Sequence, residues 1–230
     1  MERIFCALVV FFSLVDCQTV SNVQLVDYRG YFQKFSNEFA KILEQKEWCS
    51  LTLPDMEHEI NATVYTQQVL GTVKYTNGFV ASMGSIDILE SSMMQRFLSP
   101  SASQATVQVA GTIRMVNVVV GFDAEAKINE KKRHYTGVSK YDLIHNEFVI
   151  LKDLFTNEIV VTCKTVVQRS PSKMSFLPSD ETTDIMTSTY VVTSTNPAIV
   201  EWAKVFQPIA QEVATNIVPF PDICYNCPAA

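Results

Sequence analysis

Residues 105–128 read ATVQVAGTIRMVNVVVGFDAEAKI, and their apolar side chains alternate with polar ones. The apolar positions of the first part are odd-numbered: Ala105, Val107, Val109, Ile113 and Met115. Those of the second part are even-numbered: Val116, Val118, Val120, Phe122, Ala124, Ala126 and Ile128. Because successive side chains of a β-strand face opposite sides, each part presents one apolar face. The change of parity near Met115–Asn117 predicts a tight turn or a bulge, since the apolar face would otherwise turn to water.

An amphipathic helix is predicted before this stretch, because apolar residues recur there at spacings of three and four. These residues are Tyr28, Tyr31, Phe32, Phe35, Phe39, Ile42 and Leu43. A capping-box pattern at Ser21–Gln24 allows the helix to begin earlier, so we predict it over approximately residues 22–48. Its apolar face is rich in aromatic side chains.

A second amphipathic helix is predicted over residues 197–218. Its apolar face consists of Ile199, Val200, Ala203, Phe206, Ile209, Ala210, Val213 and Ile217. Asn196 is a favourable N-cap and Pro197 a favourable first helical residue. Pro208 lies inside the pattern and is predicted to kink the helix.

The residues between the helices, 60–193, read as an antiparallel meander of strands. Asn77-Gly78 is a two-residue hairpin signal, and residues 129–133 are predicted to form a charged turn. Ile185–Val192 is predicted as a last strand. The order of helix, antiparallel strands and helix places the chain in the α+β class.

Two segments of the meander are predicted to be irregular. Ser91–Gln104 reads as a loop, although it contains Met93, Met94, Phe97 and Leu98 and is more apolar than a solvated loop. Ser170–Asp184 contains proline and several serines and reads as a loop or a bulged edge.

The first 17 residues are predicted to be a secretory signal peptide. Arg3 precedes the apolar run Ile4–Val15, which is too short to span a bilayer, and Cys17 fits the last position before cleavage. A retained signal anchor is the alternative. No later segment is long and apolar enough to cross a membrane, so we expect a secreted protein without stable membrane insertion. Residues 18–230 fit one domain that ends in a cysteine-containing tail, residues 219–230.

Four cysteines remain beyond the signal peptide, and an even number in an oxidising compartment indicates two disulfides with three possible connectivities. We predict pairing of Cys49 with Cys163 and of Cys224 with Cys227. A redox pair or half of a zinc site at Cys224 and Cys227 is the alternative, less favoured because the tail is bounded by prolines and offers no further ligand nearby. Asn61-Ala62-Thr63 is a sequon, which predicts a glycan on exposed Asn61.

The sequence carries no motif for catalysis or for a cofactor or metal ion. His58-Glu59 begins like a metalloprotease helix, but Ala62 stands where the second histidine is needed. The net charge of −6 and the pI near 5.1 argue against a nucleic-acid partner. We therefore predict a protein that is not an enzyme. A site dispersed along the chain, using His58 or His145, is the weaker alternative.

Several segments resemble the mite group 7 allergen family, from Tyr28 to Val218. The resemblance is carried by Gly71–Val80, Met83–Ile88, the 105–128 stretch and the helix from Pro197. That family belongs with the insect juvenile-hormone-binding and takeout proteins, and with the bactericidal/permeability-increasing proteins, in the tubular lipid-binding superfamily. The hormone-binding branch has a cysteine pair near its mature N-terminus, whereas this chain has only Cys49 there, which favours the group 7 branch.

The resemblance implies a long, strongly curved antiparallel sheet wrapped around the C-terminal helix as a half-barrel, with a lipid-binding space between them. The side chains expected to line that space are Phe35, Phe39, Val107, Val109, Ile113, Val118, Val120, Phe206, Ile209 and Val213. The predicted function is a secreted carrier that sequesters a lipid, fatty acyl or terpenoid ligand, with a possible role in innate recognition. The alternative is an extracellular interaction module with a packed interior and a protein partner at Ser91–Gln104.

Overall fold

The computed structural model describes residues 23–46, 51–64, 66–101, 104–168, 171, 173–189 and 198–225. The strands are β1 (Val23–Leu25), β2 (Thr52–Leu53), β3 (Met56–Val64), β4 (Gln67–Ser82), β5 (Ser85–Ser101), β6 (Gln104–Ile128), β7 (Lys131–Asp153), β8 (Ile159–Val167), β9 (Lys173–Leu177) and β10 (Ile223–Tyr225). The helices are α1 (Tyr28–Gln45), α2 (Glu181–Ser188) and α4 (Trp202–Glu212), and α4 continues into the π-helical turn η2 (Val213–Ile217). Residues 198–200 are also helical. No helix among these residues is long and apolar enough to cross a membrane.

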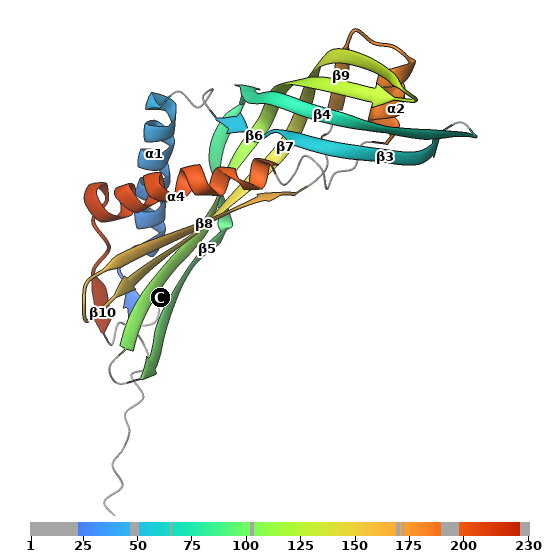
Figure 1. The fold of residues 1–230 in the computed structure, drawn as a ribbon. Helices are drawn as coiled ribbons and strands as arrows, with labels where there is room; N and C mark the ends of the chain where they lie inside the picture. Colours follow the sequence, from blue (N-terminus) through green and yellow to red (C-terminus); the bar gives the residue numbers. More distant parts are fainter. Residues whose placement is uncertain are drawn as a thin grey trace, which may run out of the picture.

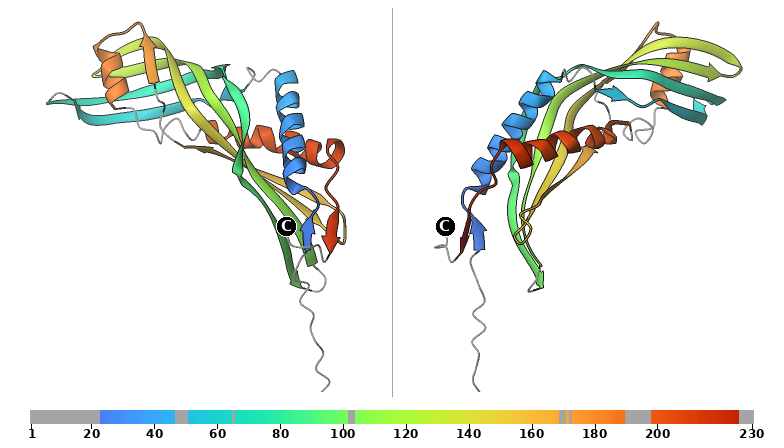
Figure 2. Two further views of the ribbon diagram at one scale, coloured as in Figure 1. Left: turned by 180° about the vertical axis from the view of Figure 1, so that it is seen from behind. Right: turned by 60° about the vertical axis from the view of Figure 1, so that its left-hand side comes forward.

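Two long antiparallel strands form the spine of the sheet. Strand β6 has 25 residues and β7 has 23, and they pair along nearly their whole length. Strands β4 and β5 follow one another along the other side of β6, while β8 and β9 pair with β7. Strands β3 and β2 extend the sheet beyond β4, and every pairing is antiparallel. Figures 1 and 2 show that this sheet is strongly twisted and curved, as the sequence analysis expected.

The parity change in residues 105–128 lies at Asn117, inside one continuous strand. Asn117 has a φ of 53°, in the left-handed region that asparagine tolerates better than most residues. Buried apolar side chains are odd-numbered up to Met115 and even-numbered from Val118 onward, so one face of β6 stays buried along the strand. The pairing register with β7 is the same on both sides of Asn117, where Val116 lies opposite Leu143 and Val118 opposite Tyr141, so β6 has no extra residue relative to β7. The predicted change of parity is present, but it is neither the tight turn nor the bulge that the sequence analysis expected.

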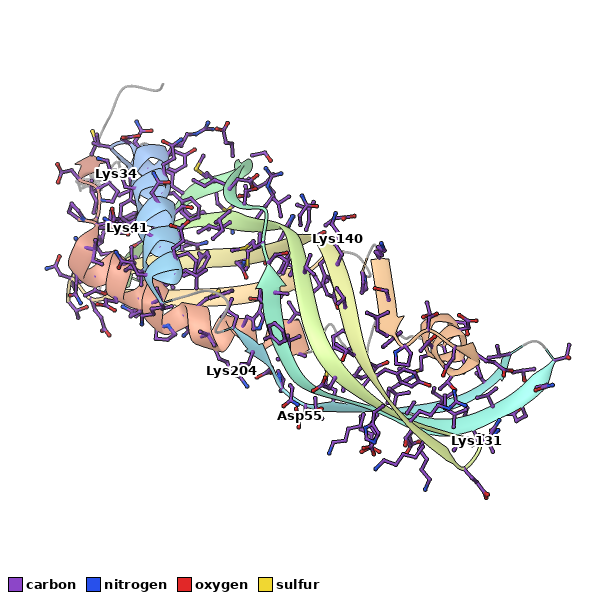
Figure 3. The ribbon with its side chains drawn as sticks, turned by 90° about the horizontal axis from the view of Figure 1, so that it is seen from above. Lys34, Lys41, Asp55, Lys131, Lys140 and Lys204 are labelled. Carbon is purple, nitrogen blue, oxygen red and sulfur yellow. The ribbon has the colours of Figure 1, made fainter. Side chains whose placement is uncertain are left out.

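The molecule divides at Asn117 into two halves, which share β6 and β7. The proximal half comprises β5, β8, residues 104–116 of β6 and 143–153 of β7, together with α1 and α4. The distal half comprises β3, β4, β9, residues 118–128 of β6 and 131–141 of β7, together with α2. Figure 2 shows α1 and α4 against the sheet at one end of the molecule and α2 at the other. In Figure 3, Lys34, Lys41 and Lys204 mark the solvent side of α1 and α4.

An aromatic cluster fills the proximal half between the helices and the sheet. Phe39 of α1 lies 5.1 Å from Phe148 of β7 and 5.7 Å from Phe206 of α4, measured between ring centroids. Phe35 contacts the same Phe148 ring at 5.5 Å, and these four rings are almost completely buried. Edge-to-face pairs of this kind add stabilisation beyond the buried area. The proximal interior is therefore packed by its own side chains.

The outer edge of β8 is capped by a glutamine of α4. Gln211 accepts a hydrogen bond from the Val161 N–H (2.8 Å) and donates one to the Ile159 carbonyl (2.7 Å). The side-chain amide thus occupies the positions that a neighbouring strand's peptide group would take. It ties α4 to the sheet at the point where the sheet ends.

Helix α2 is held on the distal half by one aspartate. Asp180 caps the helix by accepting from the Thr183 N–H (3.1 Å), while the Thr183 hydroxyl accepts from the Asp180 N–H (2.9 Å). The same carboxylate forms an ion pair with Arg133 of β7 and accepts a hydrogen bond from the Tyr135 hydroxyl (3.0 Å). Beneath the helix, Met186 is almost fully buried.

Several predicted boundaries are wrong. The first helix spans Tyr28–Gln45 rather than 22–48, because β1 precedes it and Asp27 is its N-cap. Asn77-Gly78 is not a hairpin: Asn77 has a φ of 52° at a bulge within β4, which continues to pair with β6 on both sides. A left-handed asparagine serves a turn and a bulge equally well, and pairing with β6 decides between them.

Other segments also differ from the prediction. Residues 91–101 of the predicted Ser91–Gln104 loop belong to β5 and pair with the start of β6, and Gln104 begins β6. The predicted last strand begins inside α2, because the Asp180 capping box outweighs the local strand preference of Ile185. Ser170–Asp184, predicted as a loop or a bulged edge, contains the strand β9, which pairs with β7. Pro208 lies inside α4 as expected, and residues 1–22 and 190–197 lie outside the described residues.

Candidate apolar binding site

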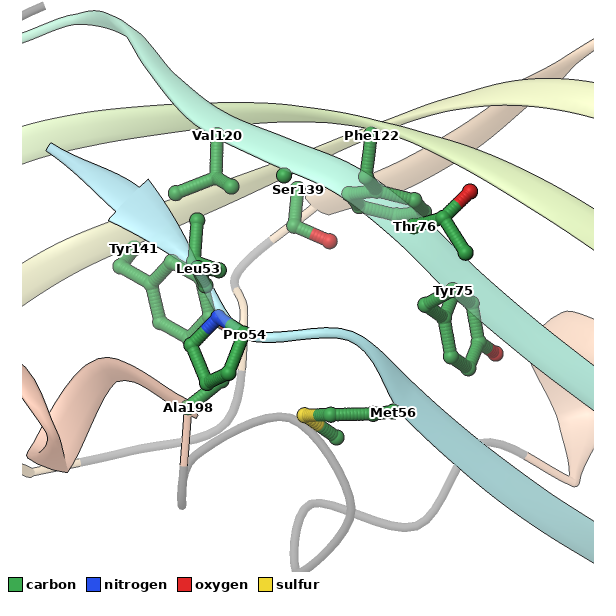
Figure 4. A pocket seen from close by; sticks show the side chains of 11 residues that line it. Leu53, Pro54, Met56, Tyr75, Thr76, Val120, Phe122, Ser139, Tyr141 and Ala198 are labelled. Atoms are coloured by element: carbon green, nitrogen blue, oxygen red, sulfur yellow. The ribbon is translucent and has the colours of Figure 1, made fainter. Parts of the chain in front are cut away.

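A small apolar cavity, here called the waist cavity, lies on the buried face of the sheet where the two halves meet. Its volume is about 30 Å³. Its inner wall consists of Val120 and Phe122 of β6 with Ser139 and Tyr141 of β7. The remaining lining residues are Leu53, Pro54, Met56, Tyr75, Thr76, Gly78 and Ala198. Figure 4 shows these side chains arranged around the space.

The outer wall of the waist cavity is a thin layer formed by Leu53, Pro54 and Met56. Pro54 is exposed and the other two are half-buried, so this wall separates the cavity from solvent. Figure 3 places neighbouring Asp55 at the outer surface. Methionine and leucine side chains have several rotamers, and the Met56 thioether in particular adapts its shape to what it contacts.

Strand β2 holds the outer wall in place. Leu53 pairs with Gly78 of β4, where an added Cβ would lie only 2.9 Å from the Leu53 Cβ, so glycine permits this close approach. The Leu51 carbonyl accepts from the Val80 N–H (3.0 Å), and the Thr52 carbonyl accepts from the Trp202 indole N–H (3.0 Å). The wall is therefore fastened to β4 on one side and to α4 on the other.

Among the described residues that line the waist cavity, none carries a charge. Burial raises the pKa of Tyr75 to about 12, and the nearby Tyr141 adds to the shift, so the Tyr75 phenol is neutral at physiological pH. Ser139 is only 2% exposed, and its hydroxyl has no hydrogen-bond partner among the described residues. Buried hydroxyls are usually hydrogen-bonded, so Ser139 is an unusual member of this wall.

The size of the cavity limits what it holds without rearrangement. A single water needs roughly 10–15 Å³ on the same kind of measure, whereas pockets that enclose a small organic ligand span about 300–1,000 Å³. The waist cavity is therefore too small for an organic ligand as it stands, and a ligand must enlarge it on binding. The outer wall is the part of its lining nearest to solvent.

A larger hollow, the distal groove, opens at the end of the distal half between the sheet and α2. Its volume is about 350 Å³. Val69 and Ile128 form an apolar floor, whereas Lys131, Arg133, Glu181 and Asp184 stand around it. Figure 3 shows Lys131 at the tip of the β6–β7 hairpin. The rim carries two positive and two negative side chains, so it has no net preference for an ion of either sign.

The predicted lining residues are all buried, but the structure gathers most of them in the proximal core. Phe35, Phe39, Val107, Val109, Ile113, Phe206, Ile209 and Val213 pack there, with exposures of 4% or less. Val118 and Val120 lie near the junction of the halves, and of the whole set only Val120 lines the waist cavity. A ligand-binding role for the other residues stays a prediction.

Sequence reasoning missed most of the waist cavity. Tyr75, Ser139 and Tyr141 occupy inward positions of alternating strands, so the alternation that identified Val120 was available for them too. Leu53 belongs to a two-residue strand and Pro54 to a connection, which leave no periodic signal, and Met56 is the first residue of β3.

The predicted pairing of Cys49 with Cys163 is wrong, because Cys163 carries a free thiol. Burial raises the pKa of this thiol to about 12. Cys224 is disulfide-bonded, and both Cys49 and Cys227 lie outside the described residues. Asn61 is exposed on β3, with its side-chain oxygen accepting from Gln68 (2.7 Å), and its glycosylation stays a prediction.

The part of the chain that the structure describes contains no group of three acidic, histidine or cysteine residues placed to hold a metal ion. His145, one candidate for a dispersed catalytic site, has its Nδ1 3.0 Å from the Gln168 amide nitrogen. Burial and the nearby Arg114 lower the pKa of His145. Its hydrogen-bond partner is thus an amide rather than the carboxylate or nucleophile of a catalytic set.

Comparisons with known proteins give a weak structural likeness. No protein-family model matches the chain, and no curated protein matches it. A solved structure described as "Crystal structure of lipopolysaccharide binding protein" aligns with 86% of this chain at a TM-score of 0.40 and 10% identity. The alignment covers 41% of that protein, so this chain spans less than half its length. A likeness at this level assigns neither a family nor a ligand to the chain.

Proposed function

We propose that this protein is a non-enzymatic binding protein that holds a small apolar molecule at the waist cavity. The observation that carries the proposal is a cavity whose described lining residues are all uncharged, on the buried face of a curved sheet, behind a thin outer wall. Apolar pockets with few polar groups are the usual form of small-molecule sites. The proposed ligand is of lipid, fatty acyl or terpenoid type, and the protein acts outside the cell, as the predicted signal peptide favours.

Binding requires displacement of the outer wall, and this requirement limits the affinity. Burial of a sixteen-carbon chain contributes on the order of 12 kcal/mol at about 0.8 kcal/mol per methylene. Association removes at least about 4 kcal/mol of this. The remainder corresponds to a Kd of about 1 μM at best. We therefore expect modest affinity and broad selectivity among apolar molecules of similar shape.

The test is a fluorescence titration of the purified protein with N-phenyl-1-naphthylamine, a neutral apolar probe. Val120→Ile adds one methylene directly at the cavity, where about 30 Å³ is free. We expect saturable binding to the wild type and at least about tenfold weaker binding to Val120→Ile. Val119→Ile is the matched control, because its side chain lies on the other face of β6 and should leave probe binding unchanged.

Two results would contradict this proposal. Equal binding by the wild type and Val120→Ile would place the probe elsewhere. No saturable binding to the wild type would mean that the interior accepts no apolar molecule.

A second candidate function is an extracellular protein-interaction module with a packed interior. Two observations favour it: the closed aromatic core of the proximal half, and exposed apolar side chains on β5. Met94 and Phe97 are each 38% exposed and Leu98 is 42% exposed. Exposed apolar surface is common at contacts between proteins. The double variant Phe97→Ser/Leu98→Ser tests this candidate. It should abolish chemical cross-linking to a partner protein in the extracellular fluid that contains the native protein. Binding of the fluorescent probe should stay unchanged.

A further inference from the structure

We propose that the Ser139 hydroxyl is the polar anchor of the waist cavity. It selects an uncharged apolar molecule that carries an oxygen function, such as an alcohol or ketone, over a hydrocarbon or a carboxylate of equal length. This inference rests on the proposed function, because it assumes that the waist cavity takes an apolar ligand. It adds the chemical class of that ligand and the residue that recognises it.

The first support is the state of the Ser139 side chain. Ser139 lies on β7 between Val120 of β6 and Met174 of β9, and only 2% of the residue is exposed. Its hydroxyl has no hydrogen-bond partner among the described residues. Figure 4 shows the oxygen directed toward the space between the lining side chains. A buried hydroxyl without a partner is rare, and a ligand oxygen at this point would complete its hydrogen bonding.

The second support is the composition of the surrounding wall. The described lining offers no lysine, arginine or histidine, so an ionised carboxylate buried here would have no countercharge. A hydroxyl donates one hydrogen bond and can also accept, so it can pair with a ketone oxygen or with an alcohol. The neighbouring Tyr75 phenol stays neutral as well, because burial raises its pKa to about 12.

The third support is the contrast with the distal groove, where Lys131, Arg133, Glu181 and Asp184 surround the floor. Charged groups are thus available in the distal half, but they line that groove and not the waist cavity. A ligand with an ionised head would find partners there, whereas the described residues that line the waist cavity offer it none. The two hollows therefore differ in the ligand chemistry that they favour.

The experiment measures displacement of N-phenyl-1-naphthylamine by dodecane, 1-dodecanol, 2-dodecanone and dodecanoate. The proteins are the wild type, Ser139→Ala and the control Ser175→Ala, an exposed serine on β9. For the wild type, we expect the alcohol and the ketone to compete at least about tenfold better than dodecanoate, which corresponds to about 1.4 kcal/mol. In Ser139→Ala, their competition should weaken about tenfold relative to dodecane, and Ser175→Ala should match the wild type.

Thermal unfolding of the same proteins separates recognition from a structural role. If the hydroxyl lacks a partner, Ser139→Ala should keep or raise the Tm, because it removes an unpaired buried polar group. A lower Tm together with unchanged ligand ratios would overturn the inference. Unchanged ratios with intact probe binding would also overturn it, while leaving the proposed function standing. Absence of probe binding by the wild type would remove both proposals together.

Discussion

The proximal and distal halves share the strands β6 and β7 but cover their common buried face differently. In the proximal half, α1 and α4 press large aromatic side chains onto the sheet, and Phe35, Phe39 and Phe206 are almost fully buried. In the distal half, the described cover is the eight-residue helix α2, held through Asp180. The waist cavity lies at the junction of the halves, and the distal groove lies in the distal half. An apolar sheet face thus becomes core or pocket according to the side chains placed over it.

Removal of an aromatic ring from the proximal core should have the largest effect on stability. Phe39→Ala deletes the ring that contacts both Phe148 and Phe206, and it leaves a cavity in a closed interior. We expect a loss of about 3–5 kcal/mol in the free energy of unfolding, measured in urea. Phe155→Ala, at a position that is 60% exposed, is the control and should change it little. A loss below about 1 kcal/mol in the free energy of unfolding for Phe39→Ala would contradict a closely packed proximal core.

Gln211→Leu should have a smaller but clear effect on the same half. The variant keeps the size of the side chain but leaves the Val161 N–H and the Ile159 carbonyl without their partner. We expect a loss of about 1–3 kcal/mol. Gln211→Glu retains an acceptor for Val161 and should fall between Gln211→Leu and the wild type. Equal losses for both variants would indicate that packing of α4, and not the amide, closes this edge.

Asp180→Ala should loosen the distal half alone. It removes the cap of α2 and the contacts with Arg133 and Tyr135, and loss of an N-cap costs about 0.5–2 kcal/mol. We expect hydrogen–deuterium exchange to become faster in residues 181–188 and to stay unchanged in α1. Faster exchange in both helices would mean that the two halves unfold as one unit.

The same aspartate predicts the effect of acid on α2. Burial alone would raise the pKa of Asp180, but the Thr183 N–H, the Tyr135 hydroxyl and Arg133 together outweigh it, and the pKa lies below its ordinary value. A lowered pKa stabilises the folded state above the ordinary value, and this contribution is lost as the pH falls through the folded-state pKa. Exchange in α2 should therefore quicken in acid for the wild type and show a weaker pH dependence in Asp180→Ala.

Chemical labelling of Cys163 changes the protein least among these experiments. Its rate measures how often the proximal half opens and exposes this thiol. Burial raises the pKa of its thiol to about 12, so little thiolate exists at pH 8. Peptide mapping after treatment with iodoacetamide should show labelling at least about a hundredfold slower than in urea-unfolded protein. Labelling at the unfolded rate would contradict a closed proximal core.

The sequence predicts the regular features of both halves better than their differences. Alternation predicts the change of parity near Met115–Asn117 and the buried face of β6, and helical spacing identifies Phe35, Phe39 and Phe206 as inward-facing residues. These predictions succeed because burial of one face imposes a period on the chain.

Features that depend on pairing or on exact side-chain shape were not predictable in this way. Asn77-Gly78 carries the same local signal for a hairpin and for a bulge, and only its pairing with β6 decides between them. The waist cavity depends on how far Met56 and Leu53 fall short of filling the space beside Val120. Apolar patterning fixes which face is buried but not how completely it is filled.

The capped edge of β8 has a consequence for aggregation. The strand reads IVVTCKTVV, a run of β-branched residues with a single charge, which is the composition typical of segments that stack into fibrils. An incoming strand from another molecule would have to displace Gln211 before it formed its first hydrogen bonds at Ile159 and Val161. The Gln211 side-chain amide on α4 thus blocks the pairing of another strand with this edge. Variants that detach α4 from the sheet should therefore form fibrils sooner than variants that destabilise α2.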